Sequence, residues 1–255
     1  MRREHLDIKT EGAVRILTMT GKPRRGNPLS RELASDLVAE LIEAEQDASI
    51  HALVLAGTET HFSVGADLAE VSQMTGIDAV LADWLEEFDR FAKARKPTIA
   101  AVRGHAVGGG FELALSCDIL VCAEDANLAL PETGIGVIAG QGGTQRLIQM
   151  AGRAIASDLI LTGRSLSGRE ASALGIAARS CPADKVFETA IAVGKKIAER
   201  SAPAVRFARE VIREASEHPM RQSLRMERLL AALILDTPER KQRVAAFLSR
   251  KAIKT

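Results

Sequence analysis

The sequence of 255 residues has no tyrosine, one tryptophan and seven phenylalanines. The lack of tyrosine excludes every mechanism in which a phenol serves as acid, base or nucleophile. The shortage of aromatic rings also argues against binding of single-stranded nucleic acid, because proteins that bind it stack bases on such rings. Any chemistry in this protein must therefore come from other side chains or from the backbone.

The sequence also lacks a charge excess, a long apolar run and a metal-binding cysteine pattern. Lys and Arg number 34 and Asp and Glu 33, for a net charge of +1, whereas nucleic-acid-binding domains are usually basic. No apolar run reaches the roughly 18 residues of a membrane-spanning helix, and the first ten residues have no apolar signal core. Three cysteines without CxxC spacing disfavour disulfides and zinc. We expect a cytoplasmic protein without metal, membrane or nucleic-acid partners.

The distribution of apolar residues divides the chain into two parts. Apolar and polar residues alternate within residues 5–20 on both sides of a turn at Glu11 and Gly12, which predicts a hairpin. Strands, glycine-rich turns and helices then follow one another, and after residue 183 amphipathic helices are interrupted at three prolines. We expect an α/β core over residues 1–195 that carries the site, and a helical region over residues 196–255 that serves oligomerisation.

Local patterns place the individual elements of the core. The predictions are a helix from Ser30 to about Ala48, strands at 51–58, 98–103, 118–123 and 176–181, a loop at 61–68, a helix through Leu81–Phe91, a glycine turn before a helix at 110–117, a short strand from Asn127, a helix from near Gly142, and a capping box of Ser167 with Glu170.

Several well-known site motifs are missing. The sequence contains no G-x-G-x-x-G, no G-x-x-x-x-G-K-[ST], no H-E-x-x-H and no G-x-S-x-G. These patterns are typical of dinucleotide sites, P-loops, zinc proteases and serine hydrolases, respectively. Their absence disfavours all four classes.

Two glycine-containing turns stand before predicted helices. Gly108, Gly109 and Gly110 form one turn, and Val64 to Asp67 form the other. Glycine lets a backbone approach a ligand closely, and the first N–H groups of a helix are unpaired and lie at its positive end. Each turn could aim one N–H at the same oxygen and stabilise an oxyanion. Tight helix–strand packing explains the glycine triplet equally well.

Two glutamates accompany these turns. Glu112 lies in the apolar string FELALS, and Glu132 follows LALP twenty residues later. A carboxyl group in an apolar run loses hydration unless it is paired or protonated. The two together suggest a general acid and a general base. Taken singly, Glu112 could simply stabilise a helix N-terminus, and Glu132 could belong to a surface turn.

Three segments, FSVGADL, KPTIAAVRGHAVGGGFELALSCD and LPETGIGVIAGQGGTQRL, resemble the crotonase (enoyl-CoA hydratase/isomerase) superfamily in order and spacing. The resemblance covers essentially the whole chain. It implies a spiral of β-β-α units with a helical C-terminal region, assembled as a homotrimer or a dimer of trimers. It also implies an acyl-CoA thioester as substrate, with coenzyme A entering as part of the substrate and no separate cofactor.

The same resemblance assigns roles within the site. It implies an oxyanion hole of Ala66 and Gly109 N–H groups, with Glu112 activating a water molecule and Glu132 delivering a proton, as in an enoyl-CoA hydratase of fatty-acid metabolism. The residues it places against coenzyme A are Arg24, Arg25, Ala66, Asp67, Leu68, Gly109 and Gly140. Residues 68–91, with Met74 and Trp84 as candidates, are expected to wall the acyl pocket.

Two other functions remain open. Isomerases of the family, which move a proton between Cα and Cγ, generally keep only the acid that corresponds to Glu132. A Δ3,Δ2-enoyl-CoA isomerase is therefore the first alternative, and the presence of Glu112 favours the hydratase. The second is a non-catalytic member that binds acyl-CoA or RNA as a scaffold.

Overall fold

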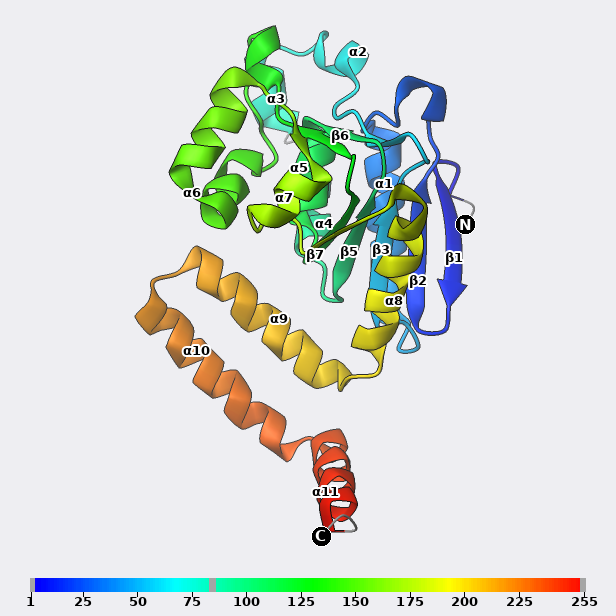
Figure 1. Ribbon diagram of the computed structural model, residues 1–255, viewed down its shortest axis with the longest axis vertical. Helices are drawn as coiled ribbons and strands as arrows, with labels where there is room; N and C mark the ends of the chain where they lie inside the picture. The colour runs from blue at the N-terminus through cyan, green and yellow to red at the C-terminus, as the bar shows by residue number, and fades with distance from the viewer. Residues whose placement is uncertain (1–2, 83–85, 253–255) are drawn as a thin grey trace. The chain divides into compact units, whose positions relative to one another are not determined.

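The computed structural model describes residues 3–82 and 86–252, and the chain forms two units, Met1–Lys195 and Lys196–Thr255 (Figure 1). The first unit opens with a hairpin of β1 (Leu6–Glu11) and β2 (Val14–Met19). Glu11 is paired with Val14, and Gly12 has the positive φ of 59° that this two-residue turn requires. The predicted hairpin is confirmed.

A six-stranded sheet forms the centre of the first unit. Its order is β1-β2-β3-β5-β7-β10, and every pairing after the hairpin is parallel. The strands beyond the hairpin are β3 (Ala52–Ala56), β5 (Thr98–Val102), β7 (Ile119–Ala123) and β10 (Arg179–Cys181). All residues of β3 and β5 are buried, which explains their continuous apolar sequence. Burial also raises the pKa of the Cys122 thiol to about 12, so this cysteine is an unreactive core residue.

A second, four-stranded sheet corrects two predictions. It consists of β4 (His61–Ser63), β6 (His105–Val107), β8 (Asn127–Ala129) and β9 (Leu166–Ser167), in that order. The loop predicted at 61–68 contains β4, and β6 lies between the strand predicted at 98–103 and the glycine turn, where no strand was predicted. These strands are too short to show an alternating pattern in the sequence. They are held by hydrogen bonding to the neighbouring strands of the sheet. His61 lies opposite His105, with their rings stacked at 5.1 Å, and His105 lies opposite Asn127.

The second sheet positions the site. Strands β4, β6 and β8 are parallel neighbours. The residues that follow them are the turn at Val64, the glycine triplet and Glu132, respectively. Carboxyl ends of parallel strands meet at one edge of a sheet, where ligands commonly bind. Three segments that are far apart in the sequence therefore come together.

Helices of the first unit follow the sheet strands. They are α1 (Arg31–Gln46), α2 (Leu68–Val71), α3 (Gly76–Ala82), α4 (Glu86–Ala92), α5 (Gly109–Ser116), α6 (Gly143–Thr162), α7 (Gly168–Ala173) and the greater part of α8 (Val186–Ala198), which continues three residues past the unit boundary. The caps at Ser30 and Ser167 are confirmed, because each side chain accepts a backbone N–H three residues on. Of the helix predicted through Leu81–Phe91, residues 81–82 are helical in α3 and residues 86–91 in α4, and the part between them, with Trp84, lies outside the described residues.

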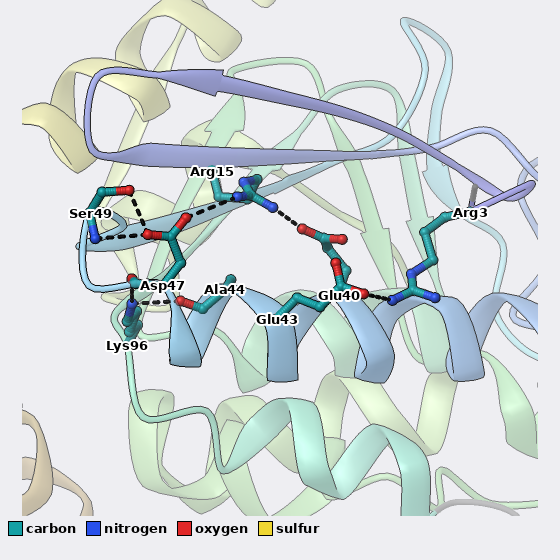
Figure 2. Close-up of polar contacts among 8 residues, drawn as sticks. All are labelled: Arg3, Arg15, Glu40, Glu43, Ala44, Asp47, Ser49 and Lys96. Atoms are coloured by element: carbon teal, nitrogen blue, oxygen red, sulfur yellow. Dashed lines mark hydrogen bonds and ion pairs between the residues drawn. The ribbon is translucent and has the colours of Figure 1, made fainter. Parts of the chain in front are cut away.

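A polar network joins α1 to the hairpin and to the segment before β5 (Figure 2). The buried carboxylate of Glu40 pairs with Arg15 of β2, whose guanidinium also lies 3.6 Å from Asp47. Lys96 donates to the carbonyl oxygens of Ala44 and Asp47 at 2.5 and 2.6 Å, which places a cation at the negative end of α1. The network ties β2 to α1, and the loop between these two elements contains Arg24 and Arg25.

The second unit is helical, as predicted. It contains α9 (Ala202–Glu217), α10 (Met220–Leu233) and α11 (Pro238–Ala252). The prolines predicted as interruptions lie at helix starts: Pro203 is in the first turn of α9, Pro219 caps α10 and Pro238 opens α11. Oligomerisation through this region stays a prediction. Across the described ranges, no helix combines the length and apolar character needed to cross a membrane.

Candidate active site

A cavity of about 710 Å³ lies where β4, β6 and β8 end. All of the residues that the resemblance assigns to catalysis, to the oxyanion hole or to coenzyme A, except Arg24, line it. These lining residues are Arg25, Ala66, Asp67, Leu68, Gly109, Glu112, Glu132 and Gly140. The structure therefore brings both glutamates and both glycine-containing turns to one hollow, while their catalytic roles stay predictions.

The two turns place their backbone N–H groups side by side. A methyl group added to Gly65 would lie 2.9 Å from the nitrogen of Gly109, and one added to Gly109 would lie 3.6 Å from the nitrogen of Ala66. Among the described residues, neither the Ala66 nor the Gly109 N–H donates a hydrogen bond. Gly109 is also the first residue of α5, at the positive end of that helix. This pair can receive an anionic oxygen.

Buried polar groups hold the turn after β4, and the sequence did not reveal them. The Ser63 hydroxyl donates to the Asn27 carbonyl oxygen at 2.7 Å and accepts the Gly65 N–H at 3.1 Å. Asn27 is fully buried with a φ of 53°. Gly110 must lack a side chain, because a methyl group there would lie 2.2 Å from the Ser63 carbonyl oxygen. The detectable signal was the Asn before Pro28, since asparagine tolerates this conformation.

Glu112 is buried in the first turn of α5, only 2% exposed. Its Oε1 accepts the N–H groups of Gln141 and Gly143, each at 2.8 Å. A methyl group on Gly143 would lie 2.7 Å from the Glu112 side chain, so only glycine lets the start of α6 approach so closely. The apolar setting noted in the sequence is thus compensated by backbone donors from the glycine-rich segment 140–143.

Glu132 begins the short 3₁₀ helix Glu132–Ile135 after β8 and is half-buried. Its Oε2 is buried and has no hydrogen-bond partner among the described residues. Burial raises the pKa of Glu132, and the nearby Glu112 carboxylate raises it further, although a hydrogen bond from the backbone opposes both effects. Glu132 therefore keeps its proton to a higher pH than an ordinary glutamate and can act as a proton donor.

The raised pKa of Glu132 predicts how stability depends on pH. A carboxyl whose pKa is higher in the folded state favours folding at low pH, and that contribution is lost as the pH rises through the folded-state pKa. Glu132→Gln removes this titration. We therefore compare the melting temperature of the variant minus that of wild type at two pH values. We expect this difference to be more positive at about pH 8 than at about pH 5. The exposed Glu59, changed to Gln, serves as control, and an equal difference at both pH values would contradict the assignment.

The loop between β2 and α1 forms the rim where the resemblance places coenzyme A. Arg24 and Arg25 are both exposed, but only Arg25 lines the cavity. Lys22, which the sequence did not single out, pairs with Asp67 at 2.8 Å and lowers the pKa of that carboxyl. Asp67 also accepts the Ala69 N–H at 3.2 Å and caps α2. The Asp67 carboxylate therefore links the β2–α1 loop, through Lys22, to the start of α2.

The remaining wall is apolar and comes from two segments. From the predicted segment 68–91, Leu68 and Val71 line the cavity but Met74 does not. The other segment follows Glu132 and was not predicted. It contributes Ile135, Val137 and Ile138, which are 62%, 47% and 80% exposed. Exposed aliphatic side chains beside a cavity suit an apolar ligand.

A metal site was not expected. The described residues hold one group of three side chains whose ligand atoms lie within 4.8 Å of one another, Glu214, Glu217 and His218. None of the three lines the cavity. The cavity instead holds the carboxyl groups of Glu112 and Glu132 beside the backbone N–H groups of Ala66 and Gly109.

Comparisons with known proteins agree with the fold and with the resemblance. The model of the enoyl-CoA hydratase/isomerase family matches residues 9–254. A "Probable enoyl-CoA hydratase" of Rhizobium meliloti is 39% identical over 98% of this chain and 97% of its own, and the 2,3-dehydroadipyl-CoA hydratase of Escherichia coli is 36% identical over 96% of both. Enoyl-CoA hydratase subunit I of Geobacillus kaustophilus matches with a TM-score of 0.93 at 33% identity, covering 96% of this chain and 95% of that one. The expected crotonase-like α/β fold is confirmed, and the chain belongs to the enoyl-CoA hydratase/isomerase family.

Proposed function

We propose that the protein is an enoyl-CoA hydratase, which adds water reversibly across the 2-trans double bond of an enoyl-CoA thioester. The observation that carries this proposal is the presence of two glutamates in one cavity with a pair of adjacent, unused backbone N–H groups. The family implies an acyl-CoA thioester as substrate. A hydratase needs a base for the water and an acid for the carbon, and Glu112 and Glu132 supply the two carboxyls.

Substrate binding uses the rim and the apolar wall. Arg25 at the cavity, and Arg24 beside it in the same 3₁₀ turn, are the cations that would meet the phosphates of coenzyme A. The acyl chain would lie against Leu68, Val71 and Ile138. A thioester seated between these two ends places its carbonyl oxygen at the Ala66 and Gly109 N–H groups.

The N–H pair activates the substrate. Hydrogen bonds from Ala66 and Gly109 to the thioester oxygen draw electrons away from the conjugated double bond, so that Cβ becomes electrophilic. As water adds, negative charge moves to this oxygen as an enolate. One such donor is typically worth about 10²–10³ in rate, because it is already oriented toward the charge that develops.

The two carboxyls then exchange protons with water and carbon. Glu112 takes one proton from the water as its oxygen bonds to Cβ, and Glu132 gives its proton to Cα. The product is the 3-hydroxyacyl thioester, with Glu112 protonated and Glu132 ionised, and one proton passing from the first to the second restores the starting state. The raised pKa of Glu132 supports its role as the acid.

Hydration of crotonyl-CoA tests the proposal, followed by the loss of absorbance of the conjugated thioester. We expect rapid hydration by the purified protein and no requirement for added metal. Isomerisation of a 3-enoyl-CoA without hydration would make the protein an isomerase instead. Binding of acyl-CoA or RNA with neither reaction would make it a scaffold.

A further inference from the structure

Gln141 is a buried side chain of the cavity that the proposed mechanism does not yet use. It lies between Gly140 and Gly142, just before α6, and is 9% exposed. It lines the cavity, and its Oε1 is buried without a hydrogen-bond partner among the described residues. Leaving a buried acceptor without a hydrogen-bond donor costs free energy, because the acceptor has lost its water and gained nothing in return. We therefore expect this oxygen to accept a hydrogen bond when the site is occupied.

Gln141 lies close both to the proposed base, Glu112, and to the N–H pair. Its backbone N–H donates to Glu112 at 2.8 Å. Its Oε1 lies 3.4 Å from the position of a methyl group added to Gly109, and the nitrogen of Ala66 lies 3.6 Å from that same position. Gly109 and Glu112 are three residues apart on α5 and so share one helix face. The Gln141 side chain therefore lies in the cavity wall, close to the glycine turn that carries the N–H pair.

The partner of this oxygen must be a hydrogen-bond donor, because an amide oxygen only accepts. The reacting end of an enoyl thioester offers a carbonyl oxygen, a sulfur and a carbon–carbon double bond, none of which donates. The water molecule that is added has two O–H groups, and Glu112 takes only one. We propose, resting on the proposed function, that Gln141 is a positioning residue that holds the second O–H of the attacking water.

This contact orients the water. With one hydrogen toward Glu112 and the other on the Gln141 oxygen, a lone pair of the water oxygen is left to bond with Cβ. Glu112 receives the first proton, Cα receives the proton of Glu132, and the second hydrogen remains on the new hydroxyl group. The hydroxyl of the product keeps its hydrogen bond to Gln141, so product affinity depends on the same contact.

Gln141→Met tests the proposal, because it removes the acceptor and keeps both the chain length and the backbone N–H to Glu112. We expect kcat for crotonyl-CoA hydration to fall about tenfold or more, with KM changed less than about twofold, because a positioning hydrogen bond to the water acts in the chemical step. The inhibition constant of 3-hydroxybutyryl-CoA should rise about as much as kcat falls. Gln145→Met, the same change at an exposed position of α6, should leave all three unchanged.

Exchange of the Cα hydrogens of butyryl-CoA with heavy water provides the second readout. This exchange needs Glu132 and the N–H pair but no added water, so Gln141→Met should retain it at the wild-type rate. Full hydration activity in Gln141→Met would overturn the proposal, and so would an equal fall of hydration and exchange, which would mean a general disturbance of the site. Wild-type protein that fails to hydrate crotonyl-CoA would overturn the proposed function itself, and this inference with it.

Discussion

Glu112→Gln is expected to lower kcat for crotonyl-CoA hydration by about 10²–10⁴-fold, the range typical of a lost general base. The substitution keeps an oxygen that can accept the N–H groups of Gln141 and Gly143, now at 2.8 Å each, so the wall of the cavity should persist. The amide cannot accept a proton from water at neutral pH. Steady-state kinetics should show this loss in kcat with little change in KM.

Another buried glutamate provides the control for this variant. Glu40 is 2% exposed, like Glu112, but pairs with Arg15 in the network of Figure 2 and does not line the cavity. Glu40→Gln should lower the melting temperature through the weakened ion pair and leave kcat near the wild-type value. A Glu112→Gln enzyme with more than about a tenth of wild-type kcat would contradict the role of Glu112 as the base.

Gly65→Ala is the second change with a large expected effect. Gly65 has a φ of 92°, which alanine rarely adopts, and the added methyl group would lie 2.8 Å from the Val107 carbonyl oxygen and 2.9 Å from the Gly109 nitrogen. The two turns must then move apart, so that the Ala66 or the Gly109 N–H no longer points at the thioester oxygen. We expect kcat/KM to fall about 10²–10³-fold, the cost of one oxyanion donor.

Gly76→Ala is the matched control for this substitution. Among the described residues outside its own helical turn, a methyl group at Gly76 meets no heavy atom within 4 Å, and the residue neither has a positive φ nor lines the cavity. Activity and melting temperature should stay close to wild type. If Gly65→Ala were as active as Gly76→Ala, the N–H pair would not be the group that stabilises the transition state.

The parts of the site that local chemistry determines could be predicted from the sequence. Glycines before a helix, a carboxyl in an apolar run and a buried strand are signalled by the residues themselves, and the structure brings Gly109, Glu112 and Glu132 to one cavity. Their roles stay predictions. The family resemblance added the substrate class, which neither composition nor spacing indicates.

The parts that depend on distant partners could not be predicted. Strands β4 and β6 have only three residues each and are held by pairing with neighbouring strands, as where His61 lies opposite His105. The support of Gly65 by Ser63 and Asn27 joins positions 36 residues apart. The burial of the Gln141 side chain and the raised pKa of Glu132 depend on the residues packed around them, which a single sequence does not specify.

The division of labour between the two glutamates is the central claim, and Cα hydrogen exchange tests it most directly. Butyryl-CoA in heavy water has no double bond to hydrate, so exchange reports only on proton transfer at Cα beside the N–H pair. We predict that Glu112→Gln keeps this exchange while losing hydration, and that Glu132→Gln loses both. Exchange that survives in Glu132→Gln, or disappears in Glu112→Gln, would contradict the assignment of Glu132 to carbon and Glu112 to water.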